Sequence, residues 1–267
     1  MPELPEVETI RRSLEPLVVG RRVASFDITR PQALRSHTPS AAARLLAGRT
    51  VTRLSRRGKA LIFHLDNNWA LTFHFALWGV VRAHDEVTAD DATAAVLRFD
   101  DGPQVEFREL QLSGFNLYPA DRLDRVPFFA QMGPDPLDAR LTATRFRKAL
   151  RGRGTLRNLL TDQTRLAGIG NLWAQEILFA AGLRPDRKAE TLTGSQWSRL
   201  YRATRSVLRR AVRAGGEPEF ADAQGRRGRY RLAVYGRTGQ PCRVCGARIV
   251  SGRVGGRPVS YCPKHQT

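Results

Sequence analysis

This chain of 267 residues is poor in features that mark secreted and membrane proteins. Its three cysteines all lie after residue 241, so they cannot close a disulfide framework and instead fit a reducing compartment. No run of about 18 apolar residues predicts a membrane-spanning helix. No leader with a charged start, an apolar centre and a small-residue cleavage site is evident at the N-terminus. Together these absences predict a cytoplasmic protein.

Acidic residues and lysines are scarce as well. Lys and Arg together number 44 against 25 Asp and Glu, which leaves a net charge of +19. Lysine occurs only at positions 59, 148, 188 and 264, so nearly all of this charge is arginine, whose planar guanidinium suits bidentate phosphate contacts. The positive field predicts a polyanionic partner. A hydrophobic content of 42% supports folded cores, in one large or two ordinary domains.

The first six residues, Met1-Pro2-Glu3-Leu4-Pro5-Glu6, carry the most chemical information. A start methionine before a small residue is normally trimmed, which would expose Pro2 as a secondary amine. Such an amine ionises at a pH of about 8, so part of it is a neutral nucleophile at neutral pH. Glu3 and Glu6 supply carboxylates beside it at helical spacing. A structural interpretation also fits, in which Pro5 starts a helix whose positive end the glutamates stabilise.

The apolar pattern changes twice along the chain. Val7, Ile10 and Leu14 recur at helical steps and predict an amphipathic helix from residue 5 to about 17. Short apolar runs separated by turn-type breaks then predict an antiparallel β sandwich with a small helix at 41–46. The predicted strands lie at 23–26, 51–54, 60–63, 69–73, 80–81, 94–97 and 105–107. After a linker at 134–136, helices are predicted at 142–152, 155–163, 171–181 and 193–214.

The C-terminal tail has the spacing of a metal-binding finger. Cys242 and Cys245 form a C-x-x-C pair, and Cys262 and His265 form a C-x-x-H pair after residues 246–261. Four N and S donors in two such pairs predict one structural zinc ion. Because no position is left open for water, the metal is expected to fold the tail rather than to catalyse a reaction. The alternative is two reduced pairs that never meet.

A glycine-rich turn, Ala167-Gly168-Ile169-Gly170-Asn171, lies between two predicted helices. Its backbone N–H groups and the positive end of the second helix would suit a phosphate. A simple tight helix–helix turn is the alternative.

Four motifs in this order resemble the Fpg/Nei family of bifunctional DNA glycosylases. They are P-E-L-P-E at the start, R-R-G-K-A-L at 56–61, D-Q-x-x-L-A-G-I-G-N at 162–171, and the terminal finger. The resemblance covers nearly the whole chain. It implies an α+β fold, in which an N-terminal helix and an antiparallel β sandwich at 1–130 join a helix-two-turn-helix DNA-binding domain at 131–220. A capping-loop region and zinc finger would follow at 221–267, with DNA in the cleft between.

The resemblance also implies roles for matching residues. Pro2 would attack C1′ of a damaged nucleotide and form a Schiff base as the base leaves, while Glu3 would move protons and Glu6 would support the site. Lys59 belongs to this catalytic group and matches a phosphate-gripping position. The other predicted phosphate contacts are His74, Gly170, Asn171 and Arg257. On residue type alone, His74 also fits a core histidine and Lys59 a solvated strand end.

The sequence departs from the family pattern at four places, three of which bear on the lesion. The methionine wedge of Fpg-type members is replaced in Ala76-Leu77-Trp78-Gly79, and the R-R-F triplet is replaced by Gln111-Leu112-Ser113. A flipped base leaves a hole that something must fill, and Leu77 and Trp78 are the predicted wedge. Residues 217–233 are short and basic for a capping loop, and His265 stands where the family usually has a fourth cysteine. Loss of the arginine that reads an orphan cytosine disfavours 8-oxoguanine opposite C.

The sequence thus predicts a monomeric, cytoplasmic, nucleoid-associated DNA glycosylase with AP lyase activity, one structural zinc ion and no catalytic cofactor. Its partner would be double-stranded DNA with a damaged base or an abasic site, with a Nei-like preference for oxidised pyrimidines or bulky or ring-opened lesions. The alternatives are an Fpg-type oxidised-purine glycosylase, a non-catalytic protein that binds damaged DNA on the same scaffold, and a zinc-dependent nuclease, which would need an open metal position.

Overall fold

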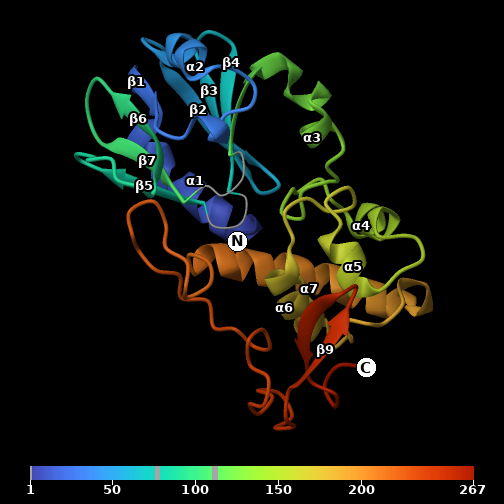
Figure 1. The fold of residues 1–267 in the computed structure, drawn as a ribbon. Coiled ribbons are helices and arrows are strands. Elements are labelled where there is room, and N and C mark those ends of the chain that lie inside the picture. Colours follow the sequence, from blue (N-terminus) through green and yellow to red (C-terminus); the bar gives the residue numbers. More distant parts are fainter. Residues whose placement is uncertain (1, 76–78, 110–113) are drawn as a thin grey trace. The chain divides into compact units, whose positions relative to one another are not determined.

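The computed structural model describes residues 2–75, 79–109 and 114–267, and the chain divides into two compact units (Figure 1). The first unit comprises residues 1–130 and 218–228, and the second comprises 131–217 and 229–267. Among the helices described, none combines the length and apolarity that a membrane crossing requires.

The first unit opens with helix α1 (Leu4–Val18). Its start is defined by a capping box, in which the Glu6 carboxylate accepts the backbone N–H of Glu3. Pro5 lies in the first turn, where a missing N–H costs nothing. Val7, Ile10 and Leu14 are fully buried on one face, as their spacing predicts.

Two four-stranded antiparallel sheets form the rest of this unit. One has the order β1-β6-β7-β5 and the other the order β2-β3-β4-β8. Their strands are β1 (Val23–Ile28), β2 (Val51–Arg57), β3 (Ala60–Leu65), β4 (Trp69–His74), β5 (Val80–His84), β6 (Thr93–Phe99), β7 (Gln104–Arg108) and β8 (Phe115–Pro119). Phe73, Phe107 and Phe115 pack with ring centroids 4.9–5.1 Å apart in the shared core. The sandwich therefore holds a rigid aromatic centre beneath α1.

Short helices complete the first unit. They are η1 (Pro31–Ala33), α2 (Pro39–Leu46), η2 (Ala120–Arg125) and α3 (Pro127–Ala130). Segment 218–228 returns to this unit from far along the chain. The N–H of Ala83 donates to the carbonyl of Ala223 at 2.7 Å, the N–H of Ala223 donates to Ser13 Oγ, and Arg82 donates to the carbonyls of Ala221 and Asp222.

The second unit is mainly helical, with a small hairpin. Its elements are α4 (Ala143–Ala149), α5 (Leu156–Thr161), α6 (Asn171–Ala181), η3 (Ala189–Thr191), α7 (Gly194–Arg213), β9 (Val250–Val254) and β10 (Arg257–Tyr261). Thr193 caps α7 through a reciprocal bond pair with Gln196. Gly182 ends α6 in the left-handed conformation, with φ of 61°.

The predicted α+β class, the antiparallel sandwich and the helical second half are confirmed. The sequence reading missed β8 and α3. Strand β8 is defined by pairing with β4, in which Phe115 lies opposite Phe73, and α3 spans only four residues, too few for a helical period. The predicted three-part domain division stays a prediction.

Candidate active site and metal centre

The start of α1 holds the predicted catalytic carboxylates in a buried position. Glu3 is 5% exposed and Glu6 is 2% exposed, whereas Pro2 is partly open to solvent. The Glu6 Oε2 atom accepts the N–H of Glu3 at 3.1 Å. The structural role that the sequence suggested for Glu6 is therefore real, and its effect is to fix the backbone directly after Pro2. A nucleophile at residue 2 would be held against a rigid helix start.

Lys59 and His74 are brought together by the sheet. Lys59 lies in the tight turn between β2 and β3, where Gly58 has φ of 56°, and its neighbour Ala60 pairs with His74 across β3 and β4. Burial, and secondarily the charge of Lys59, lower the pKa of His74. The ring of His74 meets that of Phe128 edge-on, with centroids 5.5 Å apart. The neutral imidazole has one N–H donor and the ammonium group has three, and donors of both kinds bind phosphate oxygens.

The predicted wedge residues Leu77 and Trp78 lie outside the described residues, as do residues 110–113. The wedge proposal therefore stays a prediction.

The glycine-rich turn before α6 is ordered by Gln163. Its side-chain oxygen accepts the N–H of Gly168 at 2.8 Å, and its amide donates to the carbonyl of Ile169 at 2.8 Å. Gly168 adopts φ of 100°, a conformation that side-chain-bearing residues rarely reach. Gly170 is the N-cap residue of α6, and Asn171 is the first residue of the helix. This turn places backbone N–H groups at the positive end of α6.

Asn171 is clamped between a buried arginine and the hairpin. Arg157 donates from Nε and Nη2 to the Asn171 Oδ1 atom at 3.1 and 2.9 Å. The Asn171 Nδ2 atom donates to the carbonyl of Pro258 at 3.2 Å, and Gln175 accepts the N–H of Ser260 at 2.7 Å. The exposed Arg257 directly precedes Pro258. The structure thus brings two predicted phosphate contacts, Asn171 and Arg257, to neighbouring positions.

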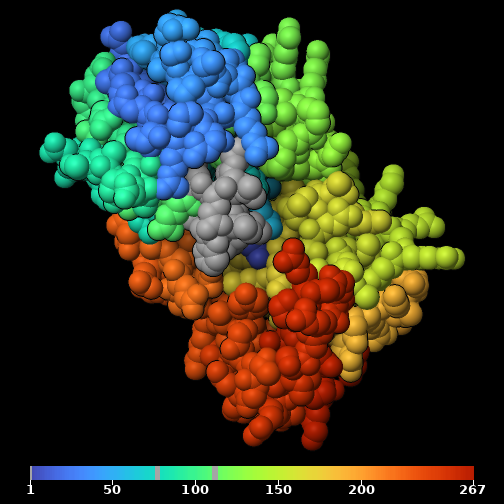
Figure 2. All heavy atoms as spheres, in the orientation of Figure 1, coloured from blue at the N-terminus to red at the C-terminus, as the bar shows by residue number. Residues whose placement is uncertain are grey.

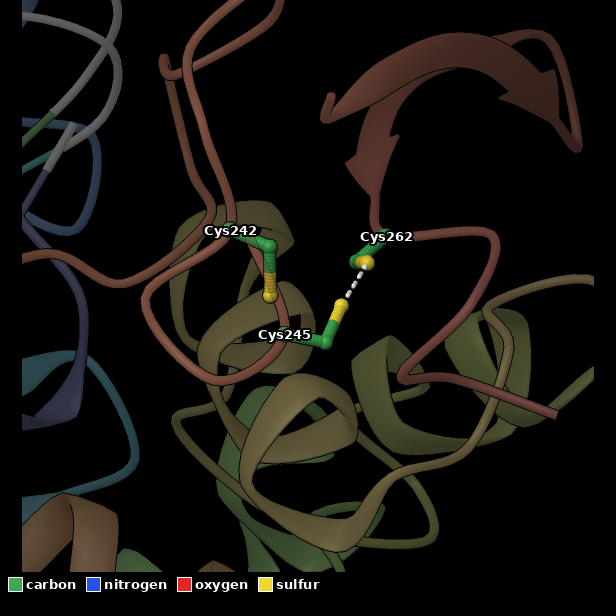
Figure 3. Close-up of side chains that lie close together, drawn as sticks. All are labelled: Cys242, Cys245 and Cys262. Carbon is green, nitrogen blue, oxygen red and sulfur yellow. Dashed lines mark hydrogen bonds between the residues drawn. The ribbon is translucent and has the colours of Figure 1, made fainter. Parts of the chain in front are cut away.

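Three cysteines converge at the base of the hairpin (Figure 3). The sulfur atoms of Cys242, Cys245 and Cys262 all lie within 4.8 Å of one another, and those of Cys245 and Cys262 are 3.4 Å apart. Backbone N–H groups of Val244 and His265 point at the sulfurs of Cys242 and Cys262, at 3.4 and 3.3 Å. Three thiols supported by N–H donors fit a soft or borderline divalent ion such as zinc.

His265 does not join this cluster of three. Its Nε2 atom lies 2.9 Å from the carbonyl oxygen of Phe179, and its ring packs on the Phe179 ring at 4.7 Å. The contact of Nε2 with α6 leaves Nδ1 as the ring nitrogen that would take a metal. The predicted role of His265 as the fourth ligand stays a prediction.

Two buried polar side chains attach the tail to α6. Glu176 is 1% exposed and accepts the N–H groups of Ala233, Val234 and Tyr235 at 2.9 to 3.1 Å. Burial raises the pKa of Glu176, and these backbone N–H groups oppose that rise. Gln266 is fully buried and donates to the carbonyl of Leu183. The cysteine cluster is therefore attached to the helix that begins at Asn171.

Sequence reasoning assigned no role to four side chains that organise this unit: Arg157, Gln163, Gln175 and Glu176. Gln163 could have been found, because it lies inside the D-Q-x-x-L-A-G-I-G-N motif. The other three are polar residues in apolar helices, and their partners lie as much as 85 residues away in the chain.

Comparisons with known proteins agree with this geometry. Residues 1–115 match the family model described as "Formamidopyrimidine-DNA glycosylase N-terminal domain", and residues 132–220 match the corresponding H2TH domain. The chain is 38% identical to the formamidopyrimidine-DNA glycosylase of Geobacillus kaustophilus over 276 residues, which covers 100% of both chains.

Solved structures agree too. A crystal structure of Lactococcus lactis Fpg with DNA containing an abasic site superposes with a TM-score of 0.91 at 30% identity, covering 99% of each chain. A complex of the same enzyme with DNA containing an oxidised pyrimidine gives a TM-score of 0.90 at 31% identity, covering 100% of each.

Proposed function

This chain belongs to the formamidopyrimidine-DNA glycosylase family, and we propose that it uses Pro2, freed by removal of Met1, as its nucleophile. It is a DNA glycosylase with AP lyase activity. Its substrate is double-stranded DNA that contains a damaged base or an abasic site. The observation that carries the assignment of Pro2 is the rigid, buried carboxylate pair of Glu3 and Glu6 directly after it.

The proposed reaction begins with attack of the amine on a sugar carbon. The Pro2 nitrogen forms a bond to C1′ as the glycosidic bond breaks, and the base leaves with that electron pair and takes up a proton. Opening of the sugar ring yields an iminium ion. The iminium acidifies the C2′ proton, and its removal expels the 3′ phosphate by β-elimination. Glu3 is proposed to move protons in these steps.

Each unit is proposed to contribute phosphate contacts. Lys59 and His74 supply an ammonium group and a neutral imidazole from the sandwich. Gly170, Asn171 and Arg257 supply a backbone N–H, an oriented amide and an exposed guanidinium from the helical unit. Such contacts position the DNA without reading its sequence.

The metal is proposed to be zinc, held by Cys242, Cys245 and Cys262. A fully ligated zinc ion stabilises a small finger and offers no open site for catalysis. As the fourth ligand, His265 would coordinate the metal through Nδ1, while its Nε2–H donates to the Phe179 carbonyl.

For the lesion, we propose the Nei-like preference predicted above, which rests on the absent R-R-F triplet at 111–113. The relatives bear formamidopyrimidine names, which give this preference no support. A panel of duplexes with an oxidised pyrimidine, a ring-opened purine or 8-oxoguanine opposite C would decide it. Fastest excision of 8-oxoguanine opposite C would favour the Fpg-type alternative. A nucleoid-associated location is proposed from the net charge of +19, which favours binding to DNA.

Borohydride reduction of the protein on abasic-site DNA tests the nucleophile. The native chain without Met1 should give a covalent complex, and Pro2→Gly should slow trapping by at least about tenfold, since the secondary amine is lost. A native chain that binds the duplex but is never trapped would instead be a non-catalytic DNA-binding protein. Strand cleavage that survives Pro2→Gly but stops on chelation in a still-folded protein would indicate a zinc nuclease.

A further inference from the structure

A basic pocket lies in the helical unit and is built entirely from residues outside the proposed active site. It has a volume of about 700 Å³ and is bounded by α4, the loop after it, η3 and the start of α7. Four cationic side chains line it: Arg147, Lys148, Arg151 and Arg153. All four are exposed, and Figure 2 shows long side chains standing out from the yellow-green surface near residue 150. Within the described part of the chain, no ion pair neutralises any of them.

The pocket is preformed rather than a gap between mobile loops. Arg165 donates from one Nη atom to the carbonyls of Ala149 and Arg151, at 3.0 and 2.7 Å. The next part of the loop is bound from the other side, because the N–H of Ala189 donates to the carbonyl of Gly154 at 3.0 Å. These bonds fix the loop backbone and leave the side chains of Arg151 and Arg153 directed to solvent. A fixed backbone leaves only side-chain freedom to be lost when these residues bind an anion.

The floor of the pocket is apolar. Ala189, Leu192 and Trp197 line it and are all buried. The guanidinium carbon of Arg147 lies 6.0 Å from the centre of the Trp197 ring. A buried floor beneath charged side chains suits a ligand with an aliphatic or aromatic group as well as negative charge.

Glu190 favours a peptide over a phosphodiester as the anionic ligand. Its carboxylate also lines the pocket. It would repel a phosphodiester, which has no hydrogen-bond donor in its backbone, but it could accept a backbone N–H of a peptide. A concave pocket of this size also fits one short segment better than the broad convex backbone of a duplex.

We propose that this pocket binds an acidic peptide segment of a partner protein, with one apolar side chain of that segment on the floor. Carboxylates of the segment would pair with Arg147, Lys148, Arg151 and Arg153. The site would tether the enzyme to another protein, and it does not depend on the proposed catalytic role of Pro2.

Fluorescence anisotropy with the full-length, metal-loaded protein tests this proposal. The probe is a labelled peptide of aspartate and glutamate residues that also carries one leucine and one phenylalanine. The double variant Arg147→Ala with Lys148→Ala should bind it at least about tenfold more weakly. The matched control, Arg202→Ala with Arg209→Ala, removes the same charge from exposed positions on α7 and should bind as the native protein does. Replacing the two apolar residues of the peptide by serine should also weaken binding.

Equal losses in both double variants would overturn the proposal, because they would reflect net charge alone. The proposal would also be overturned if the pocket variant alone lost affinity for an abasic-site duplex while both double variants bound the peptide equally well. The pocket would then belong to the DNA-binding surface. Borohydride trapping separates the two hypotheses: the pocket variant should trap normally, and failure of the native chain to trap would refute only the proposed nucleophile.

Discussion

Removing the Arg157 side chain that holds Asn171 should weaken DNA binding without changing its salt dependence, whereas removing a phosphate-binding charge should change both. Arg157 is 8% exposed and holds the Asn171 Oδ1 atom through two hydrogen bonds. Arg157→Met keeps the length and apolar stem of the side chain and removes the clamp. Among the described residues, the Asn171 side chain then keeps its hydrogen bond to the Pro258 carbonyl and can sample other rotamers.

The expected loss of duplex affinity follows from the rotamer freedom that Asn171 gains. Reordering one polar side chain on binding costs about 0.5–1.5 kcal/mol, so duplex affinity should fall about twofold to tenfold. Loss of buried hydrogen bonds should also lower the free energy of unfolding by about 1–3 kcal/mol. Because the Arg157 charge is buried, removing it should leave the salt dependence of binding unchanged. Arg257→Met, at an exposed position, should reduce the slope of log K against log salt by about 1.

The assay is titration of a duplex with an abasic-site analogue over a range of salt concentrations. It compares the native chain, Arg157→Met, Arg257→Met, Asn171→Ala and the double variant Arg157→Met with Asn171→Ala. Once Asn171 is truncated, Arg157→Met should have almost no further effect on affinity. Additive losses, or a reduced salt slope for Arg157→Met, would refute the clamp.

Three further predictions concern the metal, a histidine and a glycine. Cys245→Ala, or chelation of the native protein, should release the bound metal and lower the melting temperature. Metal analysis and differential scanning calorimetry measure these two effects. An unchanged melting temperature would contradict a structural ion. Burial, followed by the charge of Arg53, lowers the pKa of His64 from 6.5 to about 4. The folded state therefore favours the neutral imidazole, and this contribution to stability is fully present above pH 6.5. That contribution should be lost as the pH falls from 6.5 towards 4. Allowing for partial exposure it amounts to about 1–2 kcal/mol, and denaturant unfolding of His64→Gln should show a correspondingly flatter pH dependence. Gly255 has φ of 58°, and a Cβ there would lie 2.6 Å from Asn158 Oδ1. Gly255→Val should therefore displace the hairpin turn and weaken duplex binding. Gly256→Ala, which has open space around it, should weaken duplex binding less.

Local patterns in the sequence determined much of this protein. Helix α1 is specified by its own apolar spacing and capping residues, and the cysteine pairs by their separation along the chain. Most strands appear as apolar runs because each has one face in the core. These features depend on neighbours a few residues away, which a sequence displays directly.

Tertiary packing decided the rest. The orientation of His265 depends on Phe179, and that of Asn171 on Arg157 and Pro258. Segment 218–228 has no regular period, yet hydrogen bonds to the β5 backbone and to the Ser13 side chain of α1 bind it to the first unit. Hydrogen bonds between distant residues depend on the positions and directions of single atoms, which residue spacing cannot encode. The sequence therefore predicts the chemical groups of the candidate site, while the fold determines their orientation.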